Sequence, residues 1–146
     1  MSASKVQREK VMNVSAKALY RAITQFEHYP EFIKEVVSAK VQSGATKSKA
    51  KVTFELEVVK RFQYVLEFKM KPDEEVIWRL AESNFFKQND GSWNLKSIAP
   101  KKTEVQYQLE VGFGFLVPGW VSRKLTEINL PQMFEAFEAR AASLKE

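Results

Sequence analysis

Near the C-terminus, hydrophobic residues recur at the spacing of an α-helix. Between Pro118 and Leu144, apolar side chains follow one another at steps of three and four, with one longer step. This spacing places them on one face of a helix, while most charged residues fall elsewhere. At about 1.5 Å per residue the helix would span roughly 40 Å, so it needs an extended apolar surface to lie on. The apolar face consists of Val121, Leu125, Ile128, Phe134, Phe137, Ala141 and Leu144.

A proline interrupts this helical run. Pro131 has no N–H to donate, and its ring clashes with the carbonyl of the residue four positions earlier, Glu127. The sequence therefore predicts either one helix with a kink or two helices that meet at residues 129–131. We favour the single kinked helix.

Most of the preceding chain alternates between apolar and polar residues, and the clearest example is residues 49–59. A period of two is typical of an antiparallel strand with one face covered. At about 3.3 Å per residue this strand would be nearly as long as the C-terminal helix. Related patterns predict further strands at residues 5–14, 36–42, 62–71, 76–82, 84–88, 92–98 and 103–115.

Capping and turn residues divide these elements. Ser15 is a good N-cap for a helix at residues 16–26. Pro30 should then open a second short helix at residues 31–35, because proline is tolerated in the first turn of a helix. The run Asn89-Asp90-Gly91 is a strong hairpin signal, and it predicts a turn between the strands at 84–88 and 92–98.

The resulting order is a strand, two short helices, a series of antiparallel strands and one long helix. Long twisted strands that wrap around a helix form a half-barrel, which is an α+β architecture. We expect a curved antiparallel sheet of about seven strands around the C-terminal helix. With 146 residues, the chain is most simply one domain spanning residues 1–146.

Aromatic residues make up 12% of the chain, which suits a wide core or the wall of a hydrophobic pocket. Pockets are mostly apolar with a few polar groups, so the inward faces of the strands and of the long helix are candidate ligand contacts. The alternative is that these side chains simply pack against one another. The candidates are Phe54, Leu56, Tyr64, Leu66, Phe68, Trp78, Leu80, Trp93, Tyr107, Leu109, Phe134 and Phe137.

Catalytic chemistry has little support in the composition. The chain has no cysteine, and its only histidine, His28, stands beside a proline. A histidine-based triad and a thiolate or histidine metal site are therefore not expected. We expect no metal and no cofactor. The net charge of +5 favours anionic surfaces weakly, and no stretch has the roughly 20 apolar residues of a spanning helix. We expect a cytoplasmic protein.

The chain resembles the START-like superfamily, also called the SRPBCC or helix-grip fold. Within it, the similarity is greatest to the polyketide cyclase/dehydrase and coenzyme Q-binding branch. Three stretches in this order carry the resemblance: ALY at 18–20 with YPEF at 29–32, NDGSWNL at 89–95 with TEVQY at 103–107, and VPGWV at 117–121 with LP at 130–131.

This resemblance implies a cavity between the curved sheet and the long helix. Members hold lipids, quinones, polyketides or sterol-like molecules, and fold does not fix function among them. We expect a non-catalytic carrier or sensor of a hydrophobic small molecule or lipid. The alternatives are a ribosome-associated interaction protein of the toxin type and a polyketide cyclase/dehydratase.

Two surface features bear on partners. The aromatic segment from Gly112 to Trp120 could act as a flap over the cavity or touch a membrane peripherally, because its rings are costly to expose. Lysines in the strands, such as Lys49, Lys51 and Lys69, could form a basic stripe for RNA or anionic lipid. Nearby glutamates weaken that stripe, so a ribosome or RNA partner is the less favoured expectation.

Overall fold

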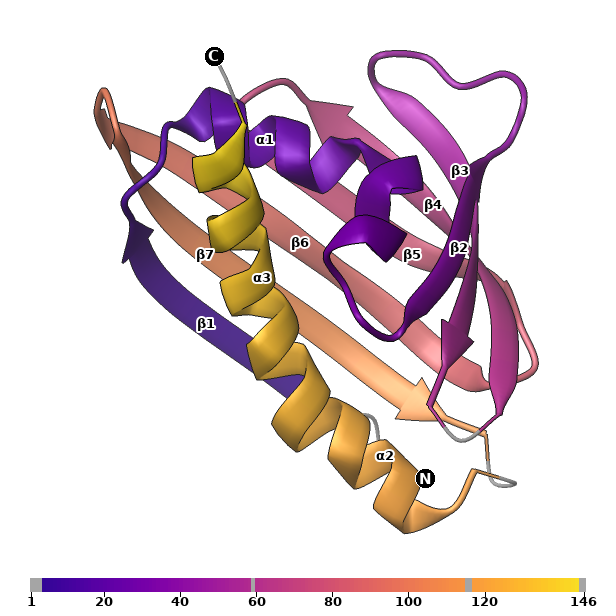
Figure 1. Cartoon of the computed structure of the whole chain (residues 1–146). Helices are drawn as coiled ribbons and strands as arrows, with labels where there is room; N and C mark the ends of the chain where they lie inside the picture. Colours follow the sequence, from indigo (N-terminus) through magenta and orange to yellow (C-terminus); the bar gives the residue numbers. More distant parts are fainter. Residues whose placement is uncertain (1–3, 59, 115–116, 145–146) are drawn as a thin grey trace.

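The computed structural model describes residues 4–58, 60–114 and 117–144. Seven strands are flanked by helices at both ends of the chain (Figure 1). The first half contains β1 (Ser4–Met12), α1 (Ala16–Thr24), the 3-10 helix η1 (Phe26–Glu31), β2 (Val36–Val41) and β3 (Lys49–Glu57). The second half contains β4 (Arg61–Lys71), β5 (Glu75–Ser83), β6 (Phe86–Ala99), β7 (Lys102–Phe113), α2 (Gly119–Lys124), the π-helix η2 (Leu125–Asn129) and α3 (Leu130–Ser143).

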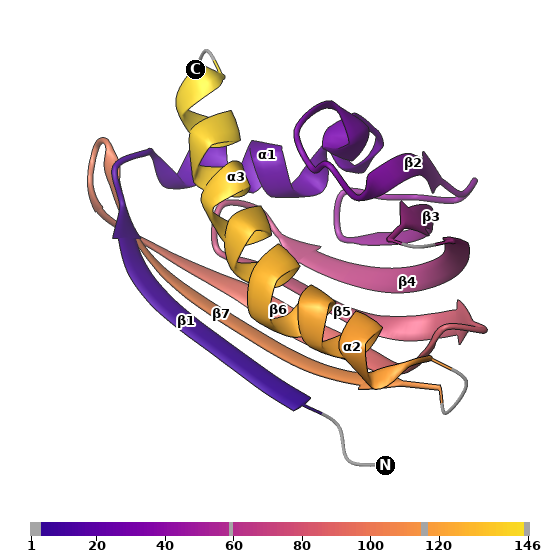
Figure 2. The same cartoon turned by 60° about the horizontal axis from the view of Figure 1, so that its bottom comes forward.

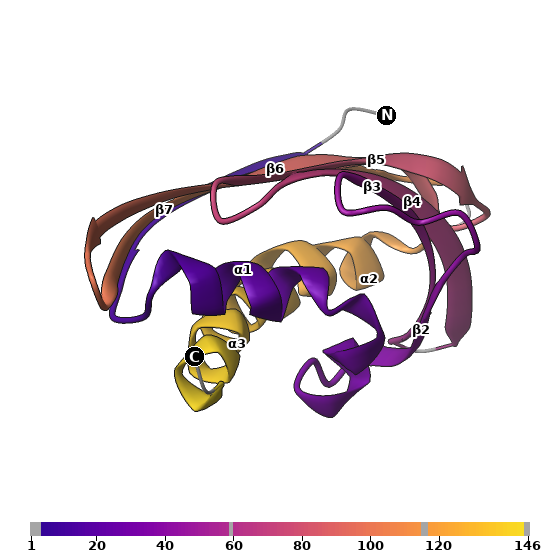
Figure 3. The same cartoon turned by 90° about the horizontal axis from the view of Figure 1, so that it is seen from above.

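The strands form one antiparallel sheet in the order β1-β7-β6-β5-β4-β3-β2. The first strand of the chain, β1, lies at one edge of the sheet. The sheet is strongly curved, and the helices lie on its concave side (Figures 2 and 3). The C-terminal helix crosses this side, and α1 packs against α3. The predicted α+β helix-grip architecture is confirmed.

Alternation decides which side chains enter the core. In β3 the burial alternates along the strand, with Phe54 inside and Lys51 outside. Inward residues of neighbouring strands stand opposite one another, as in the pairs Phe54 with Tyr64 and Phe68 with Trp78. Cross-strand aromatic pairs of this kind stabilise a sheet. The inner face of β3, β4 and β5 is therefore a continuous apolar and aromatic surface.

The predicted hairpin at Asn89-Asp90-Gly91 is wrong. The three residues lie inside β6, which runs without a turn from Phe86 to Ala99. Among the described residues outside glycine, only Asp73 has a positive φ, so the turn conformation that Asn-Gly favours is not used here. The chain turns instead before Phe86, where the Ser83 hydroxyl accepts hydrogen bonds from the N–H groups of Phe85 and Phe86, at 2.9 and 2.8 Å.

Gly91 is extended because tertiary packing needs its missing side chain. It faces the core opposite Trp78 of β5. A Cβ at this position would lie 2.3 Å from Cζ2 of the Trp78 ring and 2.5 Å from the carbonyl oxygen of Gln108. The glycine therefore leaves the space in which the Trp78 indole lies.

The first helices differ from expectation in one respect. The Ser15 cap is confirmed, since its Oγ accepts a 3.0 Å hydrogen bond from the Ala18 N–H. The second short helix is not at residues 31–35 but at Phe26–Glu31, with Pro30 inside it. Tyr29 explains the shift, because its buried hydroxyl donates to the carbonyl of Ile23 and its ring packs against Phe54. These contacts favour a 3-10 helix that includes the residues before Pro30.

The C-terminal helix is one continuous run through α2, η2 and α3 (Figure 1). Its irregularity is a wide π turn at Leu125–Asn129, just before Pro131. A wider turn accommodates a residue that lacks an N–H and crowds the preceding carbonyls. The expected disturbance at the proline therefore takes the form of a π turn.

Charged pairs hold the end of α3 on both sides. Lys10 of β1 lies 2.6 Å from a Glu138 carboxylate oxygen and 3.2 Å from Glu135. Arg140 lies 3.0 Å from Glu31 of η1 and stacks over the ring of Phe32. Such pairs near the surface add little stability each, but together they fix the position of the helix end.

We predict that Gly91→Ala destabilises the protein by about 1–3 kcal/mol, because the new methyl group overlaps the Trp78 ring and a backbone carbonyl. Chemical denaturation monitored by tryptophan fluorescence measures this loss. Gly119→Ala is the matched control, since no atom lies within 4 Å of its added Cβ and alanine favours a helix. Equal stability of the two variants would contradict the packing argument.

Candidate ligand-binding cavity

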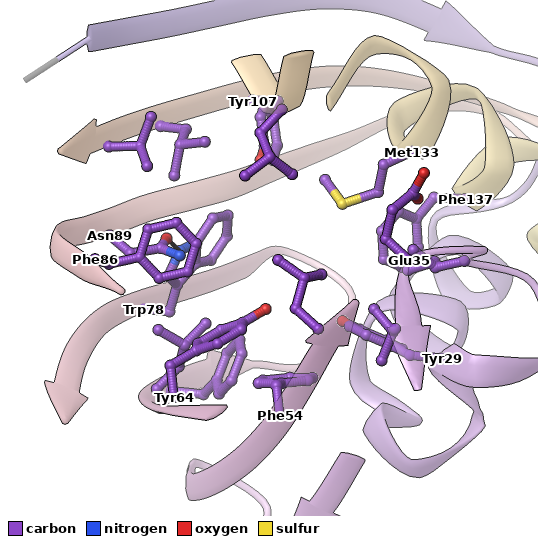
Figure 4. Close-up of a pocket in the computed structure, with 18 of the residues that line it drawn as sticks. Tyr29, Glu35, Phe54, Tyr64, Trp78, Phe86, Asn89, Tyr107, Met133 and Phe137 are labelled. Atoms are coloured by element: carbon purple, nitrogen blue, oxygen red, sulfur yellow. Dashed lines mark hydrogen bonds between the residues drawn. The ribbon is translucent and has the colours of Figure 1, made fainter. Parts of the chain in front are cut away.

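A cavity lies between the concave face of the sheet and the C-terminal helix. The volume of this cavity is about 140 Å³. Its walls come from η1, β2 to β7, η2 and α3 (Figure 4). Ten of the twelve candidate residues line it: Phe54, Leu56, Tyr64, Leu66, Phe68, Trp78, Trp93, Tyr107, Leu109 and Phe137.

The other two candidates lie outside the lining. Phe134 is buried, but its ring stacks on Trp93 at a centroid distance of 5.5 Å and packs against Tyr107. It therefore supports the cavity wall from behind. Leu80 is half-buried and packs against the edge of the core, beyond the point where β5 and β6 stop pairing.

The sequence reasoning missed ten lining residues. Some continue patterns that were already visible, such as Val111 and Phe113 at the end of the last strand. Others lay between the expected elements, as Tyr29 did before Pro30 and Asn89 did in the expected hairpin. The alternation of Leu95 and Trp93, continued backward through Gly91, was the signal that could have revealed Asn89. The ten are Tyr29, Ile33, Glu35, Val36, Phe86, Asn89, Val111, Phe113, Leu125 and Met133.

Aromatic rings form most of the wall. Phe54 stacks on Tyr64 at 5.4 Å, and Tyr64 meets Phe86 edge to face at 5.0 Å. On the other side, Trp78 and Tyr107 lie 5.9 Å apart. Because these rings already pack against their neighbours in the wall, they do not fill the space at the centre, and a cavity remains there. The walls are suited to a flat apolar molecule.

Three tyrosines bring hydroxyl groups to this apolar site. Figure 4 shows those of Tyr29 and Tyr64 pointing toward one another across the cavity. Burial raises the pKa of Tyr29, Tyr64 and Tyr107 well above the usual value of 10.0, because the phenolate would be poorly solvated. All three are therefore protonated at neutral pH and can donate hydrogen bonds.

A tryptophan–asparagine pair lies on the floor of the cavity. The Trp78 Nε1–H donates to Asn89 Oδ1 at 3.0 Å. Beyond Trp78 and Gly91, β5 pairs only with β4, and β6 pairs only with β7. The two strands are bridged there by side chains, since Asp90 Oδ1 also accepts from the Leu80 N–H at 3.3 Å.

The cavity approaches the surface beside Glu35 and Met133. These two are only half-buried, whereas nearly all of the other described lining residues are buried. Glu35 precedes β2 and Met133 lies on α3, and Figure 4 shows both on the side opposite Asn89. Glu35 is the one acidic residue of the described lining, and none of the described lining residues is lysine or arginine.

The segment from Gly112 to Trp120 is buried at its start and exposed at its end. Phe113 is buried and lines the cavity, while Trp120 is 53% exposed at the start of α2. Phe115 and Leu116, which were part of the flap or membrane prediction, lie outside the described residues. Membrane contact through this segment stays a prediction.

His28 lies away from the cavity. Its Nδ1 is 2.8 Å from Glu31, and both side chains are about half exposed. Over residues 4–58, 60–114 and 117–144 there is no cluster of acidic, histidine or cysteine side chains that could hold a metal ion. Within the same ranges, no helix has the length and apolar character to cross a membrane.

Residues 12–138 match the model of a family described as polyketide cyclase / dehydrase and lipid transport. The chain belongs to this family. A comparison with curated protein sequences found no match.

Solved structures agree with the family assignment at the level of the fold. A START superfamily protein from Mycobacterium smegmatis is 18% identical, with a TM-score of 0.81 over 97% of this chain and 99% of the other. The Zhui aromatase/cyclase from Streptomyces sp. R1128 is 10% identical, with a TM-score of 0.82 over 96% and 94%. Human STARD10 is 13% identical, with a TM-score of 0.75 over 94% of this chain and 63% of the other.

The buried tyrosines predict that this family member loses stability at alkaline pH. Above pH 10.0 the unfolded chain releases tyrosine protons, while the folded state retains those of Tyr29, Tyr64 and Tyr107. The folded state then binds more protons, so the free energy of unfolding falls as pH rises beyond 10.0. Tyrosinate absorbance should therefore appear together with unfolding in a pH titration.

The control for this titration is Tyr20→Phe, which removes the tyrosine outside the cavity and leaves only the three buried ones. Near-UV circular dichroism recorded in parallel reports the folded state. If all three titrate close to pH 10.0 while the protein stays folded, the assigned burial of the hydroxyls is wrong.

Proposed function

We propose that this protein binds a neutral hydrophobic small molecule in the cavity and acts as a non-catalytic carrier or sensor. The observation that supports this most directly is the cavity itself, a space lined by aromatic and aliphatic side chains under a helix that covers it. Binding would be driven by removal of apolar ligand surface from water, at about 25 cal/mol per Å² before the costs of association.

The size of the cavity bears on the ligand. Its 140 Å³ resembles engineered apolar cavities of about 150 Å³, which bind benzene. A ligand with one or two rings is compatible with the side chains where they stand. A long lipid or an extended polyketide would require the helix or the η1–β2 connection to move outward.

Charge supports a neutral ligand. The described lining offers no lysine or arginine to pair with a carboxylate or phosphate, and its one acidic residue, Glu35, adds no positive charge. An unpaired anion in a water-poor site is strongly disfavoured. A quinone, phenol or ketone therefore fits this lining better than a fatty acid.

Access would occur between Glu35 and Met133. Both are half-buried, and they belong to separate elements, the η1–β2 connection and α3. The ion pairs of Lys10 and Arg140 hold the C-terminal turns of α3, so an outward movement is easier nearer the π turn at Leu125–Asn129. On this proposal the 146 residues act as one ligand-binding unit.

The rival functions have weaker support. A cyclase needs groups that move protons, yet the cavity tyrosines hold theirs at neutral pH. For RNA binding, cations on the outer face are partly neutralised, since Arg79 lies 3.3 Å from Glu67 and Arg61 lies 2.9 Å from Glu57. Neither observation favours these functions over ligand binding.

We predict that Val111→Phe weakens the binding of small apolar probes. Val111 is 3% exposed and lines the cavity, so a phenyl ring there occupies the ligand space. Toluene binding, measured by isothermal titration calorimetry, should weaken at least about tenfold, the loss expected when an apolar contact of ~1.4 kcal/mol is removed.

Val11→Phe is the matched control, because Val11 is 47% exposed on the edge strand β1. This variant should bind toluene like the wild type. Native mass spectrometry and organic extraction of the purified protein would then identify any natural ligand. Failure of the wild type to bind toluene would contradict the proposed function, and a stoichiometric carboxylic acid would contradict its neutral character.

A further inference from the structure

We propose that the cavity selects a compact ring compound bearing a hydrogen-bond-accepting oxygen, and that Asn89 is the residue that recognises this oxygen. This inference rests on the proposed function and narrows its ligand class. It begins with the burial of an amide. Asn89 is 9% exposed and lines the cavity among aromatic side chains.

The orientation of the Asn89 amide follows from its partner. The indole Nε1–H of Trp78 can only donate, so the atom 3.0 Å away must be the carbonyl oxygen of the asparagine. The amide NH₂ group therefore points away from Trp78. Among the described residues it has no hydrogen-bond partner.

The NH₂ group keeps some accessible surface, as a group that faces a cavity does, and a donor without a partner costs about 1–3 kcal/mol when it is fully desolvated. Here the cost persists because Gly91 and Trp78 fix the site. The Trp78 ring occupies the space beside Gly91, and its N–H holds the asparagine in place. The amide cannot turn away without leaving the indole N–H unpaired as well. A bound acceptor oxygen would satisfy the NH₂ group without disturbing this arrangement.

Two hydroxyl groups supplement the amide. Tyr64 and Tyr107 line the same cavity and have no hydrogen bond to another described residue. Both are protonated at neutral pH, so they can donate to the same oxygen or to a second one. Tyr29 differs, because its hydroxyl already donates to the carbonyl of Ile23. The hydroxyls that are available to a ligand are thus those of Tyr64 and Tyr107 on the sheet, whereas the Tyr29 hydroxyl of η1 already has a partner.

The position of Asn89 sets the orientation of the ligand. In the β6–β7 register Asn89 stands opposite Val111, on the floor of the cavity, while Glu35 and Met133 lie at the opposite side (Figure 4). The ligand oxygen would point to the sheet floor and its apolar part to the opening. The flanking rings of Trp78, Tyr107 and Phe86 favour a flat ring in between.

The test compares acetophenone with isopropylbenzene, which has nearly the same shape but no oxygen. Affinities of both compounds are measured for the wild type, Asn89→Leu and the control variant Tyr20→Phe. Loss of the amide should lower the ratio of acetophenone to isopropylbenzene affinity about tenfold, the effect of one hydrogen bond. Tyr20→Phe should leave the ratio unchanged, because Tyr20 lies outside the described lining of the cavity.

Infrared difference spectroscopy of the wild type gives a second measurement that does not depend on folding of a variant. The carbonyl stretch of bound acetophenone should lie at lower frequency than in an alkane solvent, because a hydrogen bond weakens the C=O bond. The shift should decrease in Asn89→Leu, and also in Tyr64→Phe or Tyr107→Phe if those hydroxyls share the oxygen.

The outcomes separate the two proposals. If isopropylbenzene binds but the affinity ratio is the same in Asn89→Leu, or the carbonyl stretch is unshifted in the wild type, recognition by Asn89 is wrong while the proposed function stands. If neither compound binds the wild type, the proposed function fails, and the recognition proposal fails with it.

Discussion

Most of the concave face of the sheet is apolar, and the rest of the structure follows from the need to cover it. Curvature brings inward side chains of β3, β4 and β5 round toward those of β6 and β7, so no second sheet can fit against them. A single long helix can cross the hollow, and α1 with η1 closes the remaining side (Figure 2). The ion pairs of Lys10 and Arg140 then fix the helix end rather than drive its packing.

The cavity exists because this covering is incomplete. A straight helix touches a curved surface along a line, and bulky rings at the contact hold the two apart. Trp93, Phe134 and Phe137 fill one part of the gap through close ring contacts. Farther along, Tyr64 and Trp78 are supported by the sheet and do not reach the helix so closely, which leaves the space beside Met133.

Polar groups inside the cavity are few, and two of them connect elements of the fold. Tyr29 joins η1 to α1 through the carbonyl of Ile23. Asn89 joins β6 to β5 through Trp78, at the place where the backbone pairing of these strands ends. On the proposed function, these donors would orient the ligand within the cavity. The similarity to an aromatase/cyclase lies in the fold, and it does not carry that protein's chemistry to this chain.

The sequence by itself determined the strands and the long helix, because the periods of two and 3.6 residues are local properties of the chain. It therefore predicted most of the fold, the inward face of β3 and β4, and ten residues of the cavity wall. Tertiary structure decided the rest. Local chemistry favours a turn at Asn89-Asp90-Gly91, but the Trp78 ring needs the space at Gly91, and pairing with β7 holds the strand extended. Pro30 likewise lies within η1 because Tyr29 packs into the core. Contacts between residues distant in sequence outweighed local preference at both places, and the first of them put Asn89 into the cavity.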